Sequence, residues 1–429
     1  MADFHSSSSS PRNACHLPSE KVFSVQVGSE LFRLSGASIA SDAPSYFSRF
    51  FEEQLRLGDA AGTVRTLYID RDPATFREIA RHLQGYHIQP HDGAQFVKLF
   101  ADAQFYTLPR LMSQLFESEI FIQIGDRHFQ IPRDIFSSPG DSPNFFTLGF
   151  GAFFASPSEV FPGLERHGLL RPPSITPAAV PNRSADVFAE LLHLLRGYPL
   201  HIRNEDHRAE LLRDCRYFHL RGLEQKLIPH QLSVNPFTQR SEIALRLEDV
   251  RPSGLQVSRD AAGCSVVYAR PFVDDTPSEL ILEIAGDATL VDRATQRADF
   301  IGATKSRIAS LVQVIGKKLN LPESQLRGPP LQVRCLDREA DLTIDGEPGS
   351  QHPLWAERTT DEMPPAKRQR CEASGAGVGL EGAPLVVHQG QWRLQVQPDQ
   401  TGAYELILVA IKLAICTGPR ARNRARDFL

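Results

Sequence analysis

With 429 residues, the chain is too long for one ordinary hydrophobic core, and two or three domains are expected. The 41% hydrophobic and 23% charged residues are ordinary for a globular protein, and a net charge of −4 excludes a global attraction to nucleic acid or to an anionic membrane. The six cysteines form no C-x-x-C pair, and no stretch approaches the roughly 18 apolar residues of a membrane span, so no metal, cofactor or transmembrane segment is expected.

Residues 1–20 are rich in serine and lack the apolar core of a secretory signal. They are expected to be disordered, and the protein is expected in the cytoplasm or the nucleus. A first domain is predicted at 21–116. It begins with a β-hairpin around Gly28 and continues with a helix at 41–53 and a strand at 65–69. An amphipathic helix then ends at Gly85, and two closing helices follow.

The segment 119–232 repeats this pattern. Residues 120–125 read Ile-Phe-Ile-Gln-Ile-Gly and match Phe-Ser-Val-Gln-Val-Gly at 23–28, with an offset of 97 residues. A second block, from Phe188 to Leu227, matches Phe76 to Leu115 with an offset of 112 residues, and within it Asp214 matches Asp102. Two matching blocks in one order predict a duplicated unit, and the larger second offset predicts an insertion at about 139–181.

A third, β-rich domain is predicted from 240–344 and 383–429. Gly302 to Asn320 reads as one amphipathic helix, and strands are expected at 331–336, 384–388, 392–397 and 404–415. The intervening residues 345–382 are rich in Gly, Pro, Glu and Ala and are expected to form a disordered linker that carries a basic cluster.

Three motifs carry a family resemblance. Residues 68–79 read Tyr-Ile-Asp-Arg-Asp-Pro-Ala-Thr-Phe-Arg-Glu-Ile, residues 25–28 read Val-Gln-Val-Gly, and residues 103–108 read Ala-Gln-Phe-Tyr-Thr-Leu. In this order they resemble the potassium-channel tetramerisation class of BTB/POZ domains, which includes the KCTD adaptors. The resemblance implies an α+β protein with two tandem BTB/POZ-like domains followed by the β-rich domain.

The same resemblance implies self-association into a homo-oligomer, with candidate interface residues Asp70, Arg71, Asp72 and Phe76. The two copies can instead pair within one chain. Asp72 and Pro73 also have a local explanation, because Asp is a preferred N-cap and Pro a preferred first helical residue. The second copy has Asn-Arg-Ser-Ala at 182–185 in place of Asp-Arg-Asp-Pro.

Residues 236–243 and 421–429 resemble fungal BTB proteins related to a yeast activator of a stress-response phosphatase. This implies a non-enzymatic adaptor or scaffold that regulates a phosphatase in stress or growth signalling. Three alternatives are a cullin-type ubiquitin-ligase adaptor using the helical face after Gly85, a nuclear regulator, and a thiol enzyme. The nuclear regulator would depend on Lys367, Arg368 and Arg370. The enzyme would rest on Cys215 and His219, four residues apart on a predicted helix.

Overall fold

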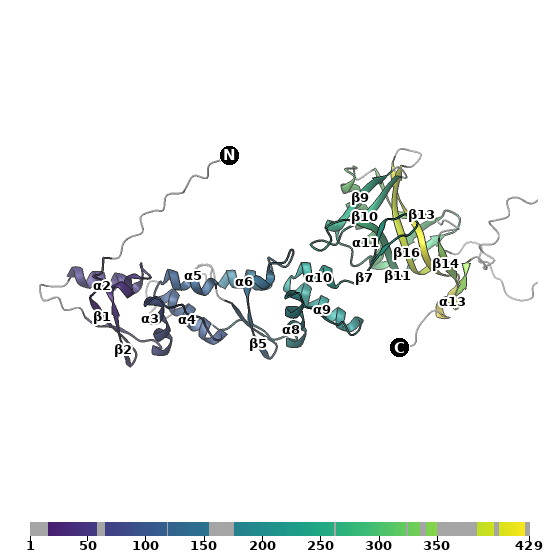
Figure 1. Cartoon of the computed structure of the whole chain (residues 1–429). Coiled ribbons are helices and arrows are strands. Elements are labelled where there is room, and N and C mark those ends of the chain that lie inside the picture. Colours follow the sequence, from purple (N-terminus) through teal and green to yellow (C-terminus); the bar gives the residue numbers. More distant parts are fainter. Residues whose placement is uncertain are drawn as a thin grey trace, which may run out of the picture. The chain divides into compact units, whose positions relative to one another are not determined.

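The computed structural model describes residues 16–57, 65–117, 119–153, 176–260, 263–322, 325–334, 340–349, 384–398 and 403–424. The chain divides into two compact units, residues 1–223 and 224–429. Figure 1 shows that the first unit runs as two successive strand-and-helix modules, with α3, α4 and α5 between the two small sheets.

The described residues of the first module form a three-stranded sheet and five helices. The sheet order is β2-β1-β3, with β1 antiparallel to β2 and parallel to β3. The elements are β1 (Val22–Val27), β2 (Glu30–Ser35), α1 (Gly36–Ala40), α2 (Tyr46–Leu57), β3 (Leu67–Ile69), α3 (Pro73–Leu83), α4 (Gly93–Phe105) and α5 (Pro109–Glu117). The predicted hairpin, strand and helices are therefore present. The turn residue of the hairpin, Gly28, has a positive φ of 53°, which glycine adopts readily.

Alternation along β1 separates its two faces. Phe23, Val25 and Val27 are buried, because they face the helices, whereas the residues between them face outward. The core behind the sheet is aromatic. The ring of Phe47 lies 5.7 Å from that of Phe76 and 4.8 Å from that of Tyr106, at the tilted or edge-to-face angles that aromatic pairs prefer.

The second module has the same strand arrangement. Its sheet order is β5-β4-β6, again with one antiparallel and one parallel pairing of the first strand. The elements are β4 (Ile120–Ile124), β5 (Arg127–Ile131), the short 3-10 helix η1 (Arg133–Phe136), α6 (Phe145–Phe153), β6 (Ala179–Val180), α8 (Ala185–Leu195), α9 (Glu205–Phe218) and α10 (Arg221–Leu227). Phe146, Phe188 and Phe218 form an aromatic core like that of the first module.

Several predicted boundaries need correction. In the segment expected to be an insertion, residues 139–153 form a turn and α6, which occupies the place of α2 in the element order, and residues 154–175 lie outside the described part. At the N-terminus, residues 16–20 are not free, because Leu17 is buried and the His16 backbone N–H donates to Glu52 at 2.7 Å. Residues 347–348, expected in the linker, form a short strand, and the rest of the linker from 350 to 382 is outside the description.

The second unit is a β-rich assembly with one long helix, as predicted. Its elements are β7 (His230–Val234), β8 (Ser241–Arg246), η2 (Pro252–Gly254), β9 (Leu255–Asp260), β10 (Gly263–Tyr268), β11 (Ser278–Asp292), β12 (Arg297–Phe300), α11 (Gly302–Lys318), β13 (Leu326–Arg334), β14 (Asp341–Ile344), β15 (Glu347–Pro348), β16 (Leu385–Pro398), β17 (Tyr404–Cys416) and α13 (Pro419–Arg424). The pairings β11–β12–β13–β17–β16–β11 close a ring of five strands.

The two strands predicted at 384–388 and 392–397 are one strand, β16. Its pairing with β17 shifts register between Val387 and Gln389 and again between Gln391 and Trp392. A side chain at Gly390 would lie 2.6 Å from the indole nitrogen of Trp392, so glycine lets the irregular strand continue past the buried ring. Among the described residues, no helix is both long enough and apolar enough to cross a membrane.

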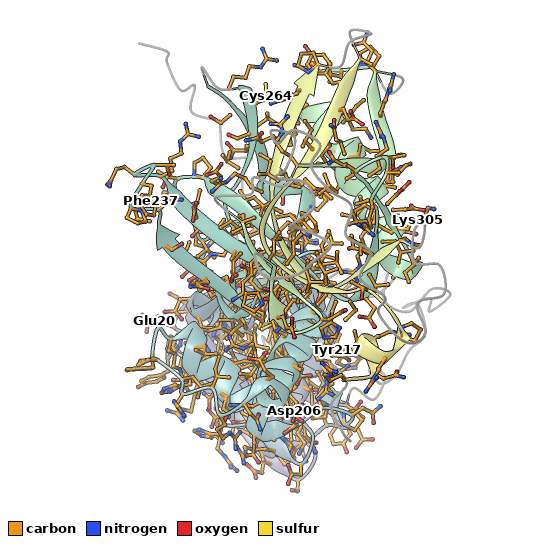
Figure 2. The ribbon with its side chains drawn as sticks, turned by 90° about the vertical axis from the view of Figure 1, so that its right-hand side faces the viewer. Glu20, Asp206, Tyr217, Phe237, Cys264 and Lys305 are labelled. Carbon is orange, nitrogen blue, oxygen red and sulfur yellow. The ribbon has the colours of Figure 1, made fainter. Side chains whose placement is uncertain are left out.

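The β7–β8 hairpin ends in an ordered turn. The Asn235 side chain accepts from the backbone N–H of Phe237 at 3.0 Å and donates to the Glu242 carboxylate at 2.9 Å. Figure 2 shows Phe237 at the end of this hairpin, where its side chain is 95% exposed.

Candidate interaction surfaces of the first unit

Arg71, a predicted interface residue, is used inside the first module. Its guanidinium pairs with Asp102 of α4 and lies over the ring of Phe105, with 5.9 Å to the ring centroid. The Asp102 side chain is only 1% exposed, so its charge depends on this partner. Burial raises the pKa of Asp102 above its ordinary value, and the hydrogen bond from Arg71 opposes that rise.

The second module contains the same arrangement. Arg183 Nη1 lies 3.0 Å from Asp214 Oδ1, and the guanidinium lies over the Tyr217 ring at 4.1 Å from its centroid. Each of these residues is 112 positions after its counterpart in the first module. Both modules contain this pair. Arg71 holds the start of α3 to α4, and Arg183 holds the start of α8 to α9. The match of Asp214 with Asp102 was the sequence signal for this pair.

Asp72 is the N-cap of α3, which confirms the local explanation. Its carboxylate accepts from the Ala74 backbone N–H at 3.1 Å and from the Thr75 hydroxyl at 2.7 Å. The Thr75 hydrogen bond is the main cause that lowers the pKa of Asp72. Ser184 caps α8 in the same way, by accepting from the Val187 N–H at 3.4 Å.

The other two candidates differ in exposure. Asp70 lies at the surface, just after β3. Phe76 is fully buried in the aromatic core, so its side chain offers no surface to a partner in this fold. A Phe three residues into an amphipathic helix faces inward for the same reason that Ile79 and Leu83 do, since these positions form its apolar stripe.

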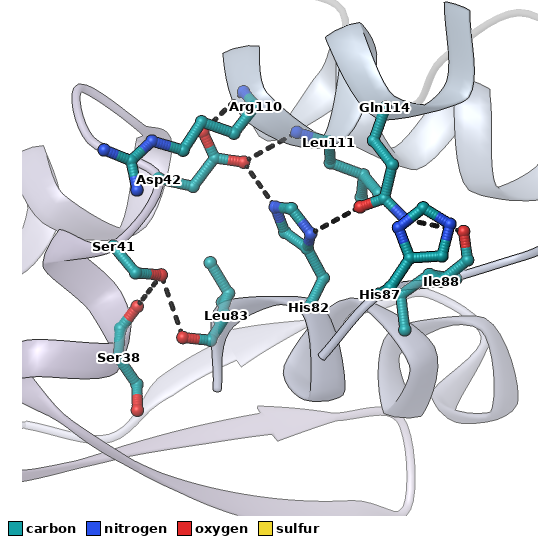
Figure 3. Close-up of polar contacts among 10 residues, drawn as sticks. All are labelled: Ser38, Ser41, Asp42, His82, Leu83, His87, Ile88, Arg110, Leu111 and Gln114. Atoms are coloured by element: carbon teal, nitrogen blue, oxygen red, sulfur yellow. Dashed lines mark hydrogen bonds and ion pairs between the residues drawn. The ribbon is translucent and has the colours of Figure 1, made fainter. Parts of the chain in front are cut away.

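Sequence reasoning missed a buried polar network around Asp42. One carboxylate oxygen of Asp42 accepts from the Arg110 backbone N–H at 2.7 Å, and the other accepts from the Leu111 N–H at 3.0 Å. His82 Nε2 lies 2.9 Å from the same carboxylate, and His82 Nδ1 lies 3.2 Å from Gln114 Oε1. Figure 3 shows that Asp42, from a loop far away in the sequence, accepts hydrogen bonds from two backbone N–H groups in the first turn of α5.

Asp141 has the corresponding role in the second module, where it accepts from the Leu223 backbone N–H of α10 at 2.9 Å. Leu194 stands at the position of His82, so this histidine belongs to the first module alone. The sequence signal was the match of Asp-Ser-Pro-Asn at 141–144 with Asp-Ala-Pro-Ser at 42–45, where both modules have a cis proline.

The two modules pack against each other through α4 and β4. The ring of Phe96 on α4 lies 5.6 Å from the ring of Phe121 on the outer face of β4. Gly93 also lies at the contact, because a Cβ there would be in ordinary van der Waals contact with Pro177 at 3.4 Å and with Phe121 at 3.5 Å. Phe96 and Val97 are consequently buried, and an apolar cavity of about 150 Å³ remains at the contact. A helical face of the first module thus packs on part of the sheet of the second, where Phe121 is half-buried and Ala179 stays exposed.

Two surfaces are equivalent to those in this contact but are not covered by the other module: α9 of the second module and the outer sheet face of the first. At the far end of the second module, α9 carries Glu205, Arg208 and Ala209 at the positions of Gly93, Phe96 and Val97, and none of the three is buried. At the near end of the first module, the outer sheet face carries Val22, Leu31 and Tyr68, which are 58%, 52% and 62% exposed.

Cys215 and His219 do not form a thiol–imidazole site. Cys215 is fully buried inside α9, and His219 ends that helix in the left-handed conformation with its side chain exposed. A thiol without exposed surface cannot reach a substrate. Among the described residues, no group of three or more His, Cys, Asp or Glu is arranged to hold a metal ion. Lys367, Arg368 and Arg370 lie outside the described residues.

Comparison with known proteins places these surfaces in context. The profile of the BTB/POZ domain family matches residues 23–116. The Saccharomyces cerevisiae "Uncharacterized protein YDR132C" is 31% identical, over 96% of this chain and 96% of that protein. The S. cerevisiae "BTB/POZ domain-containing protein YLR108C" is 33% identical over 57% of this chain and 48% of that protein.

Proposed function

The chain belongs to a family of fungal BTB/POZ proteins, and from this membership we propose that it is a non-enzymatic adaptor that binds other proteins through its first unit. The observation that carries the proposal is the outer sheet face of the BTB domain, which exposes Val22, Leu31 and Tyr68 together with the charged Arg33. A helical face of the same domain is already occupied within the chain. Exposed apolar patches rimmed by polar residues are typical of protein-binding surfaces.

We propose that residues 119–232 are a second BTB-like domain that pairs with the first inside one chain. The shared strand order, the paired Arg71–Asp102 and Arg183–Asp214 contacts, and the capping by Asp42 and Asp141 support this reading. Because α4 is covered by β4, the first domain lacks a free helical face for a ring of identical subunits.

Light scattering of the purified full chain tests this pairing. We expect a monomer at micromolar concentration, and a closed ring of several copies would refute it.

The adaptor role is tested by quantitative co-isolation from fungal cells with the full chain and with a Leu31→Lys/Tyr68→Lys variant. The matched control is Leu232→Lys/Val234→Lys, which introduces the same charges at exposed apolar residues of the second unit. We expect a set of partners that only the Leu31→Lys/Tyr68→Lys variant loses, and identical partner sets for all three proteins would contradict the role.

The nature of the partner is a finer proposal. We propose a phosphatase in stress or growth signalling, supported by the resemblance of residues 236–243 and 421–429 to fungal phosphatase activators. Phosphatase subunits should then co-isolate with the chain.

Cullin binding through the helical face after Gly85 is less favoured, because Phe96 and Val97 on that face are buried against β4. A nuclear role would require loss of nuclear signal when Lys367, Arg368 and Arg370 become Ala.

A further inference from the structure

The turn between β7 and β8 carries the most exposed large apolar side chain among the described residues. Phe237, at the tip of this turn, is 95% exposed (Figure 2), and the next in order, Leu57, is 73% exposed. Buried against a partner, a phenyl ring contributes about 150 Å² or more of apolar contact. Single exposed apolar side chains are common on protein surfaces, and it is the turn beneath Phe237 that sets this one apart.

Asn235 fixes the conformation of this turn. Its side-chain oxygen Oδ1 accepts from the backbone N–H of Phe237 at 3.0 Å and from that of Thr238 at 3.3 Å, which is the arrangement of an Asx turn. The backbone N–H of Gln239 donates to the carbonyl oxygen of Asn235 at 2.8 Å and closes the turn. The pyrrolidine ring of Pro236 restricts the φ angle of the residue before Phe237. The backbone on both sides of the exposed ring is therefore fixed in the free protein.

The turn is also tied to the sheet of the second unit. Asn235 Nδ2 donates to the Glu242 carboxylate at 2.9 Å, and Glu242 is only 8% exposed. Arg393 of β16 holds the same carboxylate, with Nη2 at 3.0 Å from Glu242 Oε1, and its Nε lies 3.1 Å from Glu279 of β11. The hairpin tip is thus connected to two further strands by ionic contacts. An aromatic ring on such a pre-organised turn loses little conformational entropy when it binds.

The residues that follow Phe237 indicate what kind of surface would receive the ring. Thr238, Gln239 and Arg240 are polar and exposed. A lipid surface favours elements that present several apolar side chains on one face, and this tip presents a single ring. One fully exposed aromatic anchor with polar neighbours matches a protein pocket that takes one ring and has a polar rim.

We propose that the turn formed by Asn235, Pro236 and Phe237 is a binding site for a partner domain that has an apolar pocket for one phenyl ring. Polar groups at the mouth of that pocket bind the backbone of the turn, whose shape Asn235 sets. The site lies in the second unit and does not depend on the adaptor role proposed for the first unit. It gives the second unit a protein partner of its own.

A panel of purified EH domains is the probe, because these domains bind Asn-Pro-Phe turns through an apolar pocket for the ring. We expect at least one of them to bind the full chain with saturation at one to one in isothermal titration calorimetry. Phe237→Ser should weaken this binding at least about thirtyfold, as expected for a buried aromatic anchor. Phe237→Leu and Asn235→Ala should each weaken it about tenfold, through loss of ring shape and loss of the fixed turn.

The matched control is Phe272→Ser. Phe272 is 51% exposed and lies two residues from Arg270, which contacts His230 at the other end of β7. This variant should bind the probe as the unmodified chain does. Because the Phe237 ring is exposed, Phe237→Ser keeps the fold, and an unchanged thermal midpoint verifies this before binding is measured.

Three results would overturn the proposal. The first is that no EH domain binds, and the second is that binding survives Phe237→Ser or is fully retained by Phe237→Leu. The third is that the ring serves another occupant. Self-association of the full chain that Phe237→Ser abolishes would assign the ring to a second copy, and sedimentation with phosphatidylcholine vesicles that the same variant abolishes would assign it to a lipid surface.

Discussion

Replacing Arg71 by Ala is expected to destabilise the first unit by about 3 kcal/mol, because it leaves the buried carboxylate of Asp102 without its ionic partner. We take the lower end of the range for broken buried pairs, since Arg71 itself is 23% exposed and water can enter its place. With a urea dependence of about 2 kcal/mol per molar, the unfolding midpoint of the first unit should fall by about 1.5 M.

The loss should depend on pH in a defined direction. Burial already raises the pKa of Asp102, and removing Arg71 raises it further. A carboxyl whose folded pKa lies above its unfolded value destabilises the fold at higher pH, and this effect vanishes as pH falls through the folded pKa. The difference between Arg71→Ala and the unmodified chain should therefore be largest at neutral pH and shrink on acidification.

The assay must report on the first unit. Both tryptophans, Trp355 and Trp392, belong to the second unit, so hydrogen exchange of peptides from 65–117 is the suitable signal. The double variant Arg71→Ala/Asp102→Ala should recover about half of the lost stability, because no buried charge remains. A single variant that unfolds like the unmodified chain, or a loss independent of pH, would refute the role of the pair.

Three further outcomes follow from local contacts. Asp72→Ala and Ser184→Ala should each cost about 1 kcal/mol through a lost N-cap, measured by urea unfolding; the Asp72 share should disappear as pH falls below its lowered pKa, and the Ser184 share should not. His82→Leu, which copies the second module, should leave α5 capped by Asp42 and change exchange there by less than Asp42→Ala does; equal effects would contradict this. Phe237→Ser should leave the thermal midpoint unchanged, because the ring is exposed, and a clear drop would show hidden packing.

Local features of the fold could be predicted from the sequence, and contacts between distant residues could not. The hairpin at Gly28 and the cap at Asp72 depend on neighbours a few positions away. The partner of Arg71 lies 31 residues further along the chain, and only the repeat at Asp214 pointed to it. The match of Asp141 with Asp42, at an offset of 99 residues, extends the first matching block, so the insertion begins later than the predicted residue 139.

The packing of α4 against the second module also has a signal in the sequence of this helix. Its buried residues include Val97 and Ala101 in addition to the inward stripe of Leu99, Phe100 and Ala103. A helix that is apolar on more than one face is buried on more than one side. The equivalent positions of Val97 and Ala101 in α9 are Ala209 and Arg213, which are exposed, so the contrast between the two copies predicts which helix lies inside the pair.

The central position of β17 in the second unit has a consequence during protein synthesis. β17 pairs with β13, β14 and β16, yet it is the last of the described strands to be translated. The ring of strands cannot close before β17 emerges from the ribosome, whereas the first unit is complete some two hundred residues earlier and is free to fold first. A premature stop codon between β16 and β17 would therefore spare the BTB domain and remove the centre of the sheet, which would leave its earlier strands exposed to aggregation.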